Sequence, residues 1–540
     1  MKKIQQLINN PELKLISKPS RTIAGVSPVA IMSKPIGCPH GTCIFCPGGP
    51  GSFFGDIPQS YTGNEPASMR AKRNNFDAYL QVFNRLEHYA LLNQSFSKNE
   101  LIIMSGTFLA APLEYQEEFI ENAFQAFNDF SMFFNDGKFD FQKFKNFFEL
   151  DGEFKNVERI KKVQEKILKL KGDCSLEKEQ KRNERSLLEK AFRENEITTC
   201  RVVALCLETK PDYCKQEHIN QALRLGCTRV ELGVQSLSND VLKFTNRGHT
   251  VEETIEAIAL LKDSFLKVTY HMMPGLPLST KEKDIEMMKN IFSDDNYKPD
   301  SLKLYPCMVM PGTALERLWK QGKFKEMRIQ DAINVLVEAK KNIPEYCRVM
   351  RVQRDIPTKV TTAGVDKTNL RQYIFEEMKK RKLKCRCIRC REPRGKEISW
   401  GDVKLKRIDY EASGGQEVFL SYEDKKNDLL LGFLRLRIPG KPFRKEINLK
   451  TAGVRELHVY GEAVSLFLGK KNPREKENVP ETQVQHRGLG KQLMEEAEKI
   501  AREEFDCDKL LVISGVGVKE YYRKLGYKDD GLYMGKKLKR

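Results

Sequence analysis

Residues 38–49 read Cys38-Pro39-His40-Gly41-Thr42-Cys43-Ile44-Phe45-Cys46-Pro47-Gly48-Gly49, and the organisation of the chain follows from this stretch. Three cysteines stand in the spacing C-x4-C-x2-C, and the prolines and glycines around them exclude a regular helix or strand. A closed structural zinc site uses four ligands, whereas a [4Fe–4S] cluster held by three cysteines leaves one iron open. The loop therefore predicts such a cluster on Cys38, Cys43 and Cys46. A zinc site completed by His40 is the alternative.

Length and composition exclude several classes of protein. A chain of 540 residues is long enough for two or more domains. It contains no apolar run of membrane-spanning length, and its first residues lack the apolar core of a signal peptide. The 14 cysteines fit a reducing compartment in which clusters of thiols bind metals. We therefore expect a cytoplasmic protein without a membrane partner, and oligomerisation stays open.

The chain is strongly basic. Its formal net charge is +19, because 93 lysines and arginines outnumber 74 aspartates and glutamates. Such an excess favours a polyanionic partner, nucleic acid first, although a lysine-rich proteome would also produce basic surfaces.

Short apolar runs alternate with segments of helical periodicity. The runs that predict buried strands are residues 101–104, 202–207, 229–234, 268–273 and 302–305. Alternating strands and helices predict a parallel sheet or barrel, whose chemistry lies at the carboxyl ends of the strands. The cofactor-binding residues expected there are Ser105, Gly106, Thr107, Glu208, Gln235 and His271.

Residues 120–196 interrupt this alternation and predict a helical insertion. Its first half is rich in phenylalanine, which we expect to form a small core of its own, with a base-stacking platform as the alternative. Before it, residues 68–92 predict one helix that carries several basic side chains.

A dense basic run over residues 379–396 separates two domains and contains Cys385, Cys387 and Cys390. Three thiols in an exposed, charged segment are liable to oxidation unless a metal binds them. We therefore predict a structural zinc site, with Cys307 as the favoured fourth ligand and Cys347 as the alternative. Three reduced surface thiols are the remaining interpretation.

The composition changes again after residue 397. Strand patterns over residues 429–438 and 454–460 precede the loop Gln485-His486-Arg487-Gly488-Leu489-Gly490, which opens a predicted helix over 491–504. Backbone N–H groups at a helix amino terminus suit a pyrophosphate. A further strand over 510–514 and a tyrosine-rich segment over 521–527 follow.

This last order of elements resembles the GNAT acetyltransferases, in which the loop binds the pyrophosphate of coenzyme A and a late tyrosine lies near the thioester. The cysteine loop resembles that of radical S-adenosylmethionine (SAM) enzymes, whose usual spacing is C-x3-C-x2-C. Together they are similar to the family of the Elongator catalytic subunit, in a stand-alone microbial form. The motifs that carry this resemblance are residues 43–49, 59–63, 208–214, 231–236, 245–250, 351–357, 455–460 and 513–517.

The resemblance implies an α/β fold, with a radical SAM partial (β/α) barrel followed by a GNAT domain. The implied divisions are a basic arm (1–20), a radical SAM domain (21–378), a zinc linker (379–397) and a GNAT domain (398–540). The implied activity is formation of 5-carboxymethyluridine at the tRNA wobble position. A 5′-deoxyadenosyl radical takes a hydrogen atom from the acetyl methyl group of acetyl-CoA, the carbon radical adds to the base, and the thioester is hydrolysed. An electron donor is therefore also implied.

The same resemblance implies functional residues. Those for acetyl-CoA are Lys98, Glu456, Leu457, His458, Val459, Gln485, Arg487, Gly488, Leu489, Gly490, Lys491 and Tyr522. The implied catalytic residues are Tyr521, Tyr522 and Glu456. Together with the basic composition it predicts contacts to the tRNA anticodon loop by Arg70, Lys72, Arg73, Lys380, Arg381 and Lys382. A protein lysine acetyltransferase that uses the GNAT domain alone and a non-catalytic tRNA-binding scaffold remain as alternatives.

Overall fold

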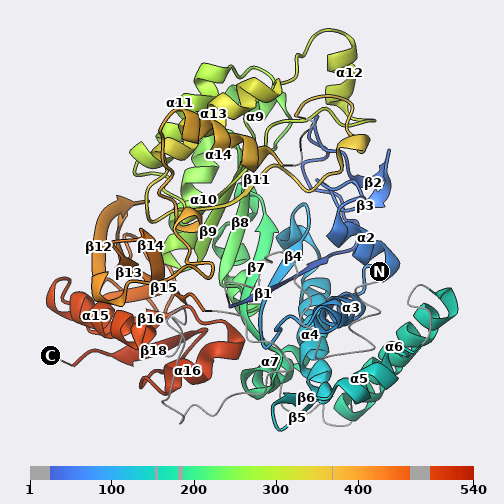
Figure 1. Cartoon of the computed structure of the whole chain (residues 1–540), viewed down its shortest axis with the longest axis vertical. Coiled ribbons are helices and arrows are strands. Elements are labelled where there is room, and N and C mark those ends of the chain that lie inside the picture. Colours follow the sequence, from blue (N-terminus) through green and yellow to red (C-terminus); the bar gives the residue numbers. More distant parts are fainter. Residues whose placement is uncertain are drawn as a thin grey trace.

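The computed structural model describes residues 25–151, 156–179, 186–365, 367, 369–461 and 487–539. The predicted basic arm lies outside these residues. Two large sheets, joined by a linker, organise the described part of the chain (Figure 1). None of the helices in these ranges combines the length and apolarity that crossing a bilayer requires.

The first sheet is entirely parallel and confirms the predicted barrel class. Its strands, in spatial order, are β1 (Ser27–Met32), β4 (Lys98–Met104), β7 (Arg201–Thr209), β8 (Arg229–Gln235), β9 (Lys267–Met272), β10 (Ser301–Leu304) and β11 (Arg348–Val352). The five inner strands were predicted, because strands buried on both faces read as apolar runs. The two edge strands, β1 and β11, were not.

Helices connect these strands, and most of them pack with the strands in one core, whereas α9 and α12 pack against the cysteine loop in a smaller buried cluster (Figure 1). The connecting helices are α3 (Ala78–Leu91), α4 (Leu113–Phe130), α7 (Leu187–Ile197), α8 (Gln216–Arg224), α9 (Asn239–Phe244), α10 (Val251–Asp263), α11 (Lys281–Ser293), α12 (Ala314–Lys320) and α13 (Ile329–Asn342). After β11, α14 (Leu370–Lys380) leads into the linker. A small hairpin of β2 (Gly49–Ser52) and β3 (Gly55–Ile57) follows the cysteine loop.

The helix predicted over residues 68–92 is in fact two helices. α2 (Pro66–Arg73) ends before Asn75 and Phe76, whose φ angles of 49° and 58° lie in the left-handed region. α3 begins anew because the Asp77 side chain accepts a hydrogen bond from the backbone N–H of Leu80 at 2.8 Å. A side-chain cap of this kind overrides helical periodicity.

The predicted insertion contains α4 to α7, with α5 at Phe141–Phe147 and α6 at Val157–Glu179, and a hairpin of β5 (Phe134–Asn135) and β6 (Lys138–Phe139). Its phenylalanines are buried, which excludes the base-stacking alternative for Phe124, Phe130 and Phe144. The prediction of a separate core is wrong, because these rings belong to the same buried cluster as the strands of the first sheet.

The second sheet is mixed. Its order is β12 (Val403–Ala412), β13 (Gly415–Asp424), β14 (Leu429–Ile438), β15 (Thr451–Val459), β16 (Lys509–Val512), β18 (Tyr533–Lys537) and β17 (Lys528–Asp530). Helices α15 (Leu489–Glu503) and α16 (Lys519–Arg523) complete this part. β15 pairs with β16 only over Thr451–Val454. The rest of β15 has no strand on that side among the described residues.

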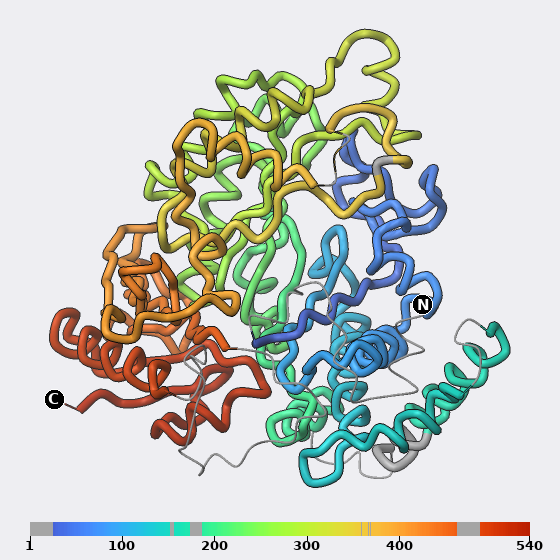
Figure 2. Tube along the Cα trace, viewed as in Figure 1, coloured from blue at the N-terminus to red at the C-terminus, as the bar shows by residue number. Residues whose placement is uncertain are grey.

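The two sheets pack directly against each other. A Cβ added at Gly515 would lie 2.0 Å from the Val203 carbonyl oxygen, so the backbones themselves touch. Figure 2 shows the red C-terminal segment against the green segments of the first sheet. Buried ions also cross this interface: Arg455 donates to Asp300 at 2.5 and 2.9 Å and to Glu417 at 3.0 Å, and Arg437 donates to Asp263 at 2.6 Å.

Asp300→Ala is expected to destabilise the protein by about 3–5 kcal/mol, because removing one partner of a buried ion pair strands the other charge. Although burial opposes it, Arg455 holds the pKa of Asp300 well below its usual range. The contribution of Asp300 is therefore fully present above the unfolded carboxyl pKa of about 4 and is lost as the pH falls below it. Thermal unfolding of wild type and variant at several pH values measures this.

Lys450→Ala serves as the control, since its pair with Asp506 is largely exposed and is expected to contribute less than about 1 kcal/mol. An Asp300→Ala protein that unfolds like the Lys450→Ala protein at neutral pH would contradict the prediction.

Candidate functional site

A single cavity of about 1330 Å³ lies between the two sheets. The cysteine loop contributes Phe45 and Cys46, and the first sheet contributes residues along the length of its strands, from their amino ends to their carboxyl ends. From the second sheet and its helices the cavity is lined by Glu456, Leu457, His458, Val459, Gly488, Leu489, Gly490, Lys491, Tyr521 and Tyr522. Both predicted binding regions therefore open into the same space.

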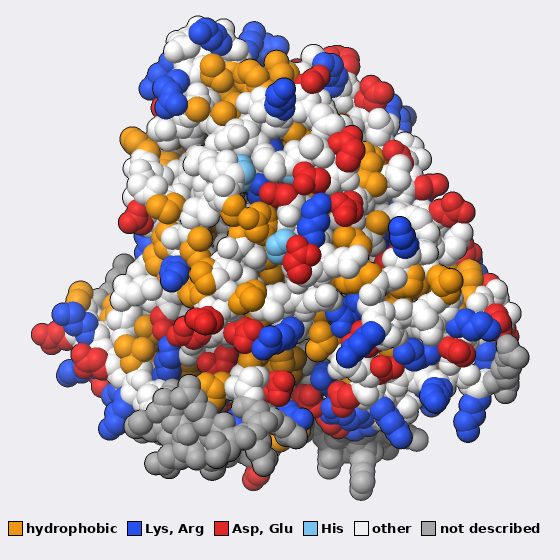
Figure 3. Space-filling model, turned by 180° about the vertical axis from the view of Figure 1, so that it is seen from behind, with side chains coloured by type: hydrophobic (Ala, Val, Ile, Leu, Met, Phe, Trp, Pro, Cys, Tyr) orange, Lys and Arg blue, Asp and Glu red, His pale blue; other side chains and the backbone are white. Residues whose placement is uncertain are grey.

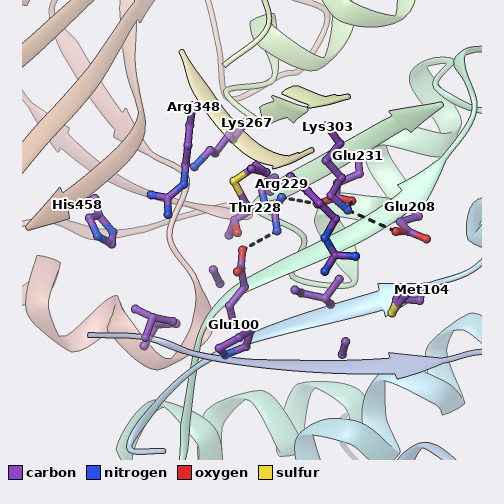
Figure 4. A pocket seen from close by; sticks show the side chains of 18 of the residues that line it. Glu100, Met104, Glu208, Thr228, Arg229, Glu231, Lys267, Lys303, Arg348 and His458 are labelled. Carbon is purple, nitrogen blue, oxygen red and sulfur yellow. Dashed lines mark hydrogen bonds and ion pairs between the residues drawn. The ribbon is translucent and has the colours of Figure 1, made fainter. Parts of the chain in front are cut away.

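A row of alternating charges covers the inner face of the first sheet (Figure 4). Arg229 donates to Glu100 at 2.7 Å and to Glu231 at 2.6 Å. Lys303 forms an ion pair with Glu231 and lies 3.8 Å from Glu208. These residues stand on β4, β7, β8 and β10, so their proximity depends on strand register.

Neighbouring charges on this row shift the pKa values of Glu231 and His271. Although burial opposes it, Lys303 and Arg229 hold the pKa of Glu231 well below its usual range. Burial and Lys303 lower the pKa of His271, whose Nε2 lies 2.9 Å from Glu231. The carboxylate of Glu208 accepts hydrogen bonds from the Tyr61 hydroxyl at 2.5 Å and from the Ser105 N–H at 3.3 Å.

The cysteine loop is held by groups far away in the sequence. Gln59 accepts from the Cys38 N–H at 2.5 Å and donates to the Gly41 carbonyl at 3.2 Å. Donors also point at the sulfur atoms. The Ser60 N–H lies 3.1 Å from Cys46 Sγ, and the Arg247 guanidinium lies 3.2 Å from Cys43 Sγ.

The acetyl-CoA region predicted on the second sheet lies where β15 leaves β16. Within the described chain β16 does not extend alongside residues 456–459, and the amino terminus of α15 faces the same cavity. A Cβ at Gly490 would lie 2.9 Å from the Tyr521 hydroxyl, so the amino terminus of α15 approaches this tyrosine closely. This geometry suits an extended ligand with a pyrophosphate.

Two titratable side chains of β15 face this region. Although burial opposes it, Lys267 and Arg435 lower the pKa of Glu456 to about 2, which makes its carboxylate an ion-pair partner and a poor proton acceptor. Burial lowers the pKa of His458 to about 4, so its imidazole is neutral at pH 7. Within the described residues, His458 Nε2 has no hydrogen-bond partner.

The linker cysteines form a second group. The Sγ atoms of Cys385, Cys387 and Cys390 all lie within 4.8 Å of one another. Cys385 and Cys387 are buried, so the segment is less exposed than its charge predicted. The Lys340 ammonium group, itself fully buried, lies 3.4 Å from Cys385 Sγ.

Cys307 does not belong to this group, which corrects its prediction as the favoured fourth ligand. It packs in a different buried cluster, together with Cys43 and Phe45 of the cysteine loop. Cys347, the alternative, lies in the same cluster as Cys385 and Cys387, and its carbonyl oxygen accepts from the Ile388 N–H at 3.0 Å.

Comparison with known proteins agrees with this arrangement. Residues 32–291 match the radical SAM superfamily, residues 299–380 the radical SAM C-terminal domain, and residues 388–527 the acetyltransferase (GNAT) family. The chain is 48% identical over 530 residues to the tRNA uridine(34) acetyltransferase of Methanocaldococcus infernus, which covers 97% of this chain and 88% of the relative. It is 41% identical over 540 residues to Elongator complex protein 3 of Saccharomyces cerevisiae, with 97% and 85% covered.

This chain belongs to the Elongator complex protein 3 family. The solved structure of the archaeal Methanocaldococcus infernus Elp3 with an N-terminal deletion superposes with a TM-score of 0.74 at 43% identity, and 96% of this chain and 100% of that chain are covered. Membership of the radical SAM superfamily implies a [4Fe–4S] cluster and SAM, and the GNAT match implies acetyl-CoA.

The residues of this family member fit an iron–sulfur cluster. Backbone and guanidinium N–H groups point at cysteine sulfurs, as thiolate ligands require. Tetrahedral zinc has Zn–S bonds of about 2.3 Å, which bring its sulfur ligands within roughly 4 Å of one another. Among the described residues the three cysteines of the loop do not form a group within 4.8 Å, so a single zinc ion fits them poorly.

The predicted site residues divide into two sets. Ser105, Gly106, Glu208, Gln235, His271, Lys98 and Arg70 line the cavity together with the residues of the second sheet named above. Thr107 instead contacts Cys38 Sγ at 3.4 Å, and Arg487 lies over the Trp400 ring at 3.9 Å. Gln485 lies outside the described residues.

Sequence reasoning missed most of the charged lining. Arg229, Lys267 and Lys303 stand within strands. Their side chains match the usual alternation of apolar and polar residues along a strand, so the sequence alone does not mark them as cavity-lining. Two others carried a signal: Tyr61 and Arg247 stand in segments (59–63 and 245–250) that already supported the family resemblance.

Gly248→Ala is expected to destabilise the protein more than Gly322→Ala. Both glycines have left-handed φ angles, +68° and +69°. A Cβ at Gly248 would also lie 2.4 Å from His40 Cβ in the cysteine loop, whereas one at Gly322 meets nothing within 4 Å. The difference isolates overpacking, which typically costs about 1–3 kcal/mol.

Thermal unfolding of both variants measures this difference, and iron content after reconstitution reports on the loop itself. Equal destabilisation by the two substitutions would show that the cysteine loop moves aside without cost.

Proposed function

We propose that this protein is a tRNA uridine(34) acetyltransferase that builds a carboxymethyl group on the wobble base from acetyl-CoA. The observation that carries the proposal is the shared cavity, which the cysteine loop lines at one end and the acetyl-CoA region at the other. A radical formed at one end and an acetyl group bound at the other require such a common, enclosed space.

In this proposal Cys38, Cys43 and Cys46 bind the cluster, which supplies one-electron reductive cleavage of SAM. The row of charges formed by Glu208, Glu231 and their partners orients polar groups of SAM at the carboxyl ends of the strands. Residues 456–459 and 488–491 bind acetyl-CoA. Buried Tyr522 and the adjacent Tyr521 close the cavity near the thioester and exclude water.

The position of the acetyl-CoA region disfavours acetylation of a protein lysine. Its segment of β15 faces the first sheet, and the carboxylate best placed as a base, Glu456, is held in ion pairs with Lys267 and Arg435. A purely structural role is disfavoured as well, because the cavity is large enough for two cofactors.

We also propose that Cys385, Cys387 and Cys390 bind a structural zinc ion. The fully buried Lys340 ammonium group supports this, because its nearest partners are these thiols and a buried cation requires a counter-charge. Zinc ionises the thiols that bind it and so supplies that charge. Cys347 is the fourth ligand that best fits the packing.

For tRNA we propose an approach along the side of the cavity formed by β11 and the linker. Four arginines line it there, namely Arg351, Arg354, Arg389 and Arg394, and they suit the phosphates that flank an unpaired base. Of the predicted residues, Arg70 lines the cavity, whereas Lys72, Arg73, Lys380, Arg381 and Lys382 are exposed outside it. Figure 3 shows acidic and basic side chains interspersed on one face, so net charge alone does not mark the binding surface.

Anaerobically reconstituted protein given SAM, dithionite, acetyl-CoA and tRNA is expected to form 5-carboxymethyluridine, as nucleoside mass spectrometry measures. Replacing Cys38, Cys43 and Cys46 with alanine is expected to abolish both iron binding and product, because no ligand for the cluster remains. Cys507→Ala, a buried cysteine of the second sheet's core, is the control and should keep both. Product from the triple variant, or acetyl-lysine formed without SAM, would contradict the proposal.

Cys387→Ala is expected to lose zinc, because it removes the central thiol of the group, whose Sγ lies 3.5 Å from that of Cys390. Elemental analysis of the purified proteins measures this. Cys307→Ala should retain zinc, and Cys347→Ala tests the fourth ligand. Full zinc content in Cys387→Ala would mean that the thiols are free.

The variant Lys380→Ala/Arg381→Ala/Lys382→Ala is expected to weaken tRNA binding and to flatten its salt dependence, by roughly 0.7–0.9 in log–log slope for each phosphate that the protein no longer neutralises. Acetyl-CoA binding should not change, since none of the three lines the cavity. In the same assay, tRNA should stimulate acetyl-CoA turnover by wild type.

The control is Lys450→Ala/Lys499→Ala/Lys528→Ala, which removes the same charge from exposed lysines of the second sheet and α15. If both triple variants lose the same affinity, the linker residues act only through net charge.

A further inference from the structure

The turn between α9 and α10, residues 245–248, braces the cysteine loop at several points. The Ile44 N–H donates to the Thr245 carbonyl at 3.2 Å, and the Asn246 amide donates to the Thr42 carbonyl at 2.9 Å. Gly248 touches His40 so closely that no side chain fits. The cysteine loop is therefore positioned by a segment about 200 residues later in the chain.

Within this brace, Arg247 makes the direct contact with a predicted cluster ligand. Its side chain is buried, with Nη1 3.2 Å from Cys43 Sγ and Nη2 2.6 Å from the Gly233 carbonyl oxygen. In the described ranges no carboxylate oxygen lies within 4.0 Å of its guanidinium group. The Cys43 sulfur is therefore the nearest group that can balance this buried cation.

A second cation reaches the same sulfur through His40. The Lys210 ammonium lies 2.8 Å from His40 Nδ1, and His40 Nε2 lies 3.3 Å from Cys43 Sγ. An ammonium group can only donate, so Nδ1 accepts and the ring hydrogen stands on Nε2. His40 then donates to Cys43.

Among the residues that the structure describes, the other two cysteines receive hydrogen bonds from neutral groups only. Cys46 Sγ receives the Ser60 backbone N–H, and Cys38 Sγ lies beside the Thr107 hydroxyl. Both cationic contacts thus converge on one sulfur of three. Since hydrogen bonds and charge at the sulfurs set the potential of an iron–sulfur cluster, this asymmetry has a predictable effect.

We propose that Arg247, directly, and Lys210, through His40, are positioning residues that raise the reduction potential of the cluster by stabilising its reduced, more negative state at Cys43. This rests on the proposed function, which assigns the cluster to this loop. Reduction adds one electron and no new bond, so the arginine and lysine act only through charge and hydrogen bonding.

The test is a redox titration followed by electron paramagnetic resonance on reconstituted full-length protein, without SAM or tRNA. In Arg247→Met the ratio of reduced to oxidised cluster at a fixed applied potential is expected to fall about tenfold, equivalent to about 59 mV for a one-electron couple. Lys210→Met should lower the ratio as well, by a smaller factor than Arg247→Met. Lys243→Met, which removes an exposed cation from α9, should leave it unchanged.

The outcomes separate this inference from the proposed function. Wild-type protein that binds no iron would overturn the proposed function itself. Arg247→Met with full iron content and wild-type potential would overturn the inference alone, and so would an equal shift in Lys243→Met. If Arg247→Met loses its iron, Arg247→Gln, which keeps an N–H donor without the charge, and Lys210→Met decide, and wild-type potentials in both would refute the role.

Discussion

The buried ions between the two sheets determine how the rest of the molecule is arranged. Arg455 lies between Asp300 of the first half and Glu417 of the second, and all three side chains are shielded from water. Because leaving any of these charges unpaired is costly, only one register of the sheets satisfies them. That arrangement places residues 456–459 of β15 against the amino ends of the barrel strands, where Glu456 pairs with Lys267 at the start of β9, and the cavity lies between them.

Chemistry in this cavity depends on rigid positioning by distant segments. The cysteine loop has little regular structure, yet Gln59 and the turn at 245–248 hold it from two sides. On the inner face of the sheet, Lys303 and Arg229 hold the pKa of Glu231 well below its usual range although burial opposes this, and hydrogen bonds from Tyr61 and Ser105 hold the Glu208 carboxylate in place. A loop near the cluster is therefore as constrained as a core element, which suits a site that must exclude water.

Sequence patterns predicted the inner strands, the cysteine loop and the glycine loop of the second half, because each has a local signature. They missed the edge strands, where Pro28 and Arg348 interrupt the apolar pattern. They also failed to predict which side chains are buried at the interface between the two sheets. Arg435 and Arg437 alternate along β14 as solvent-facing residues do, yet they are 1% and 0% exposed. Burial of these arginines is decided by the other half of the chain, whereas the position of Cys307 is decided by packing against the cysteine loop, which lies about 260 residues earlier in the chain.

The limited pairing of β15 with β16 constrains how the two halves of this chain can evolve. The open side of β15 is covered by the first sheet, so the acetyl-CoA region has a wall that its own half does not encode. Recombination that moved the second half into another gene would carry away buried arginines without Asp263 and Asp300. The halves are therefore not exchangeable modules, and each must be inherited with the other.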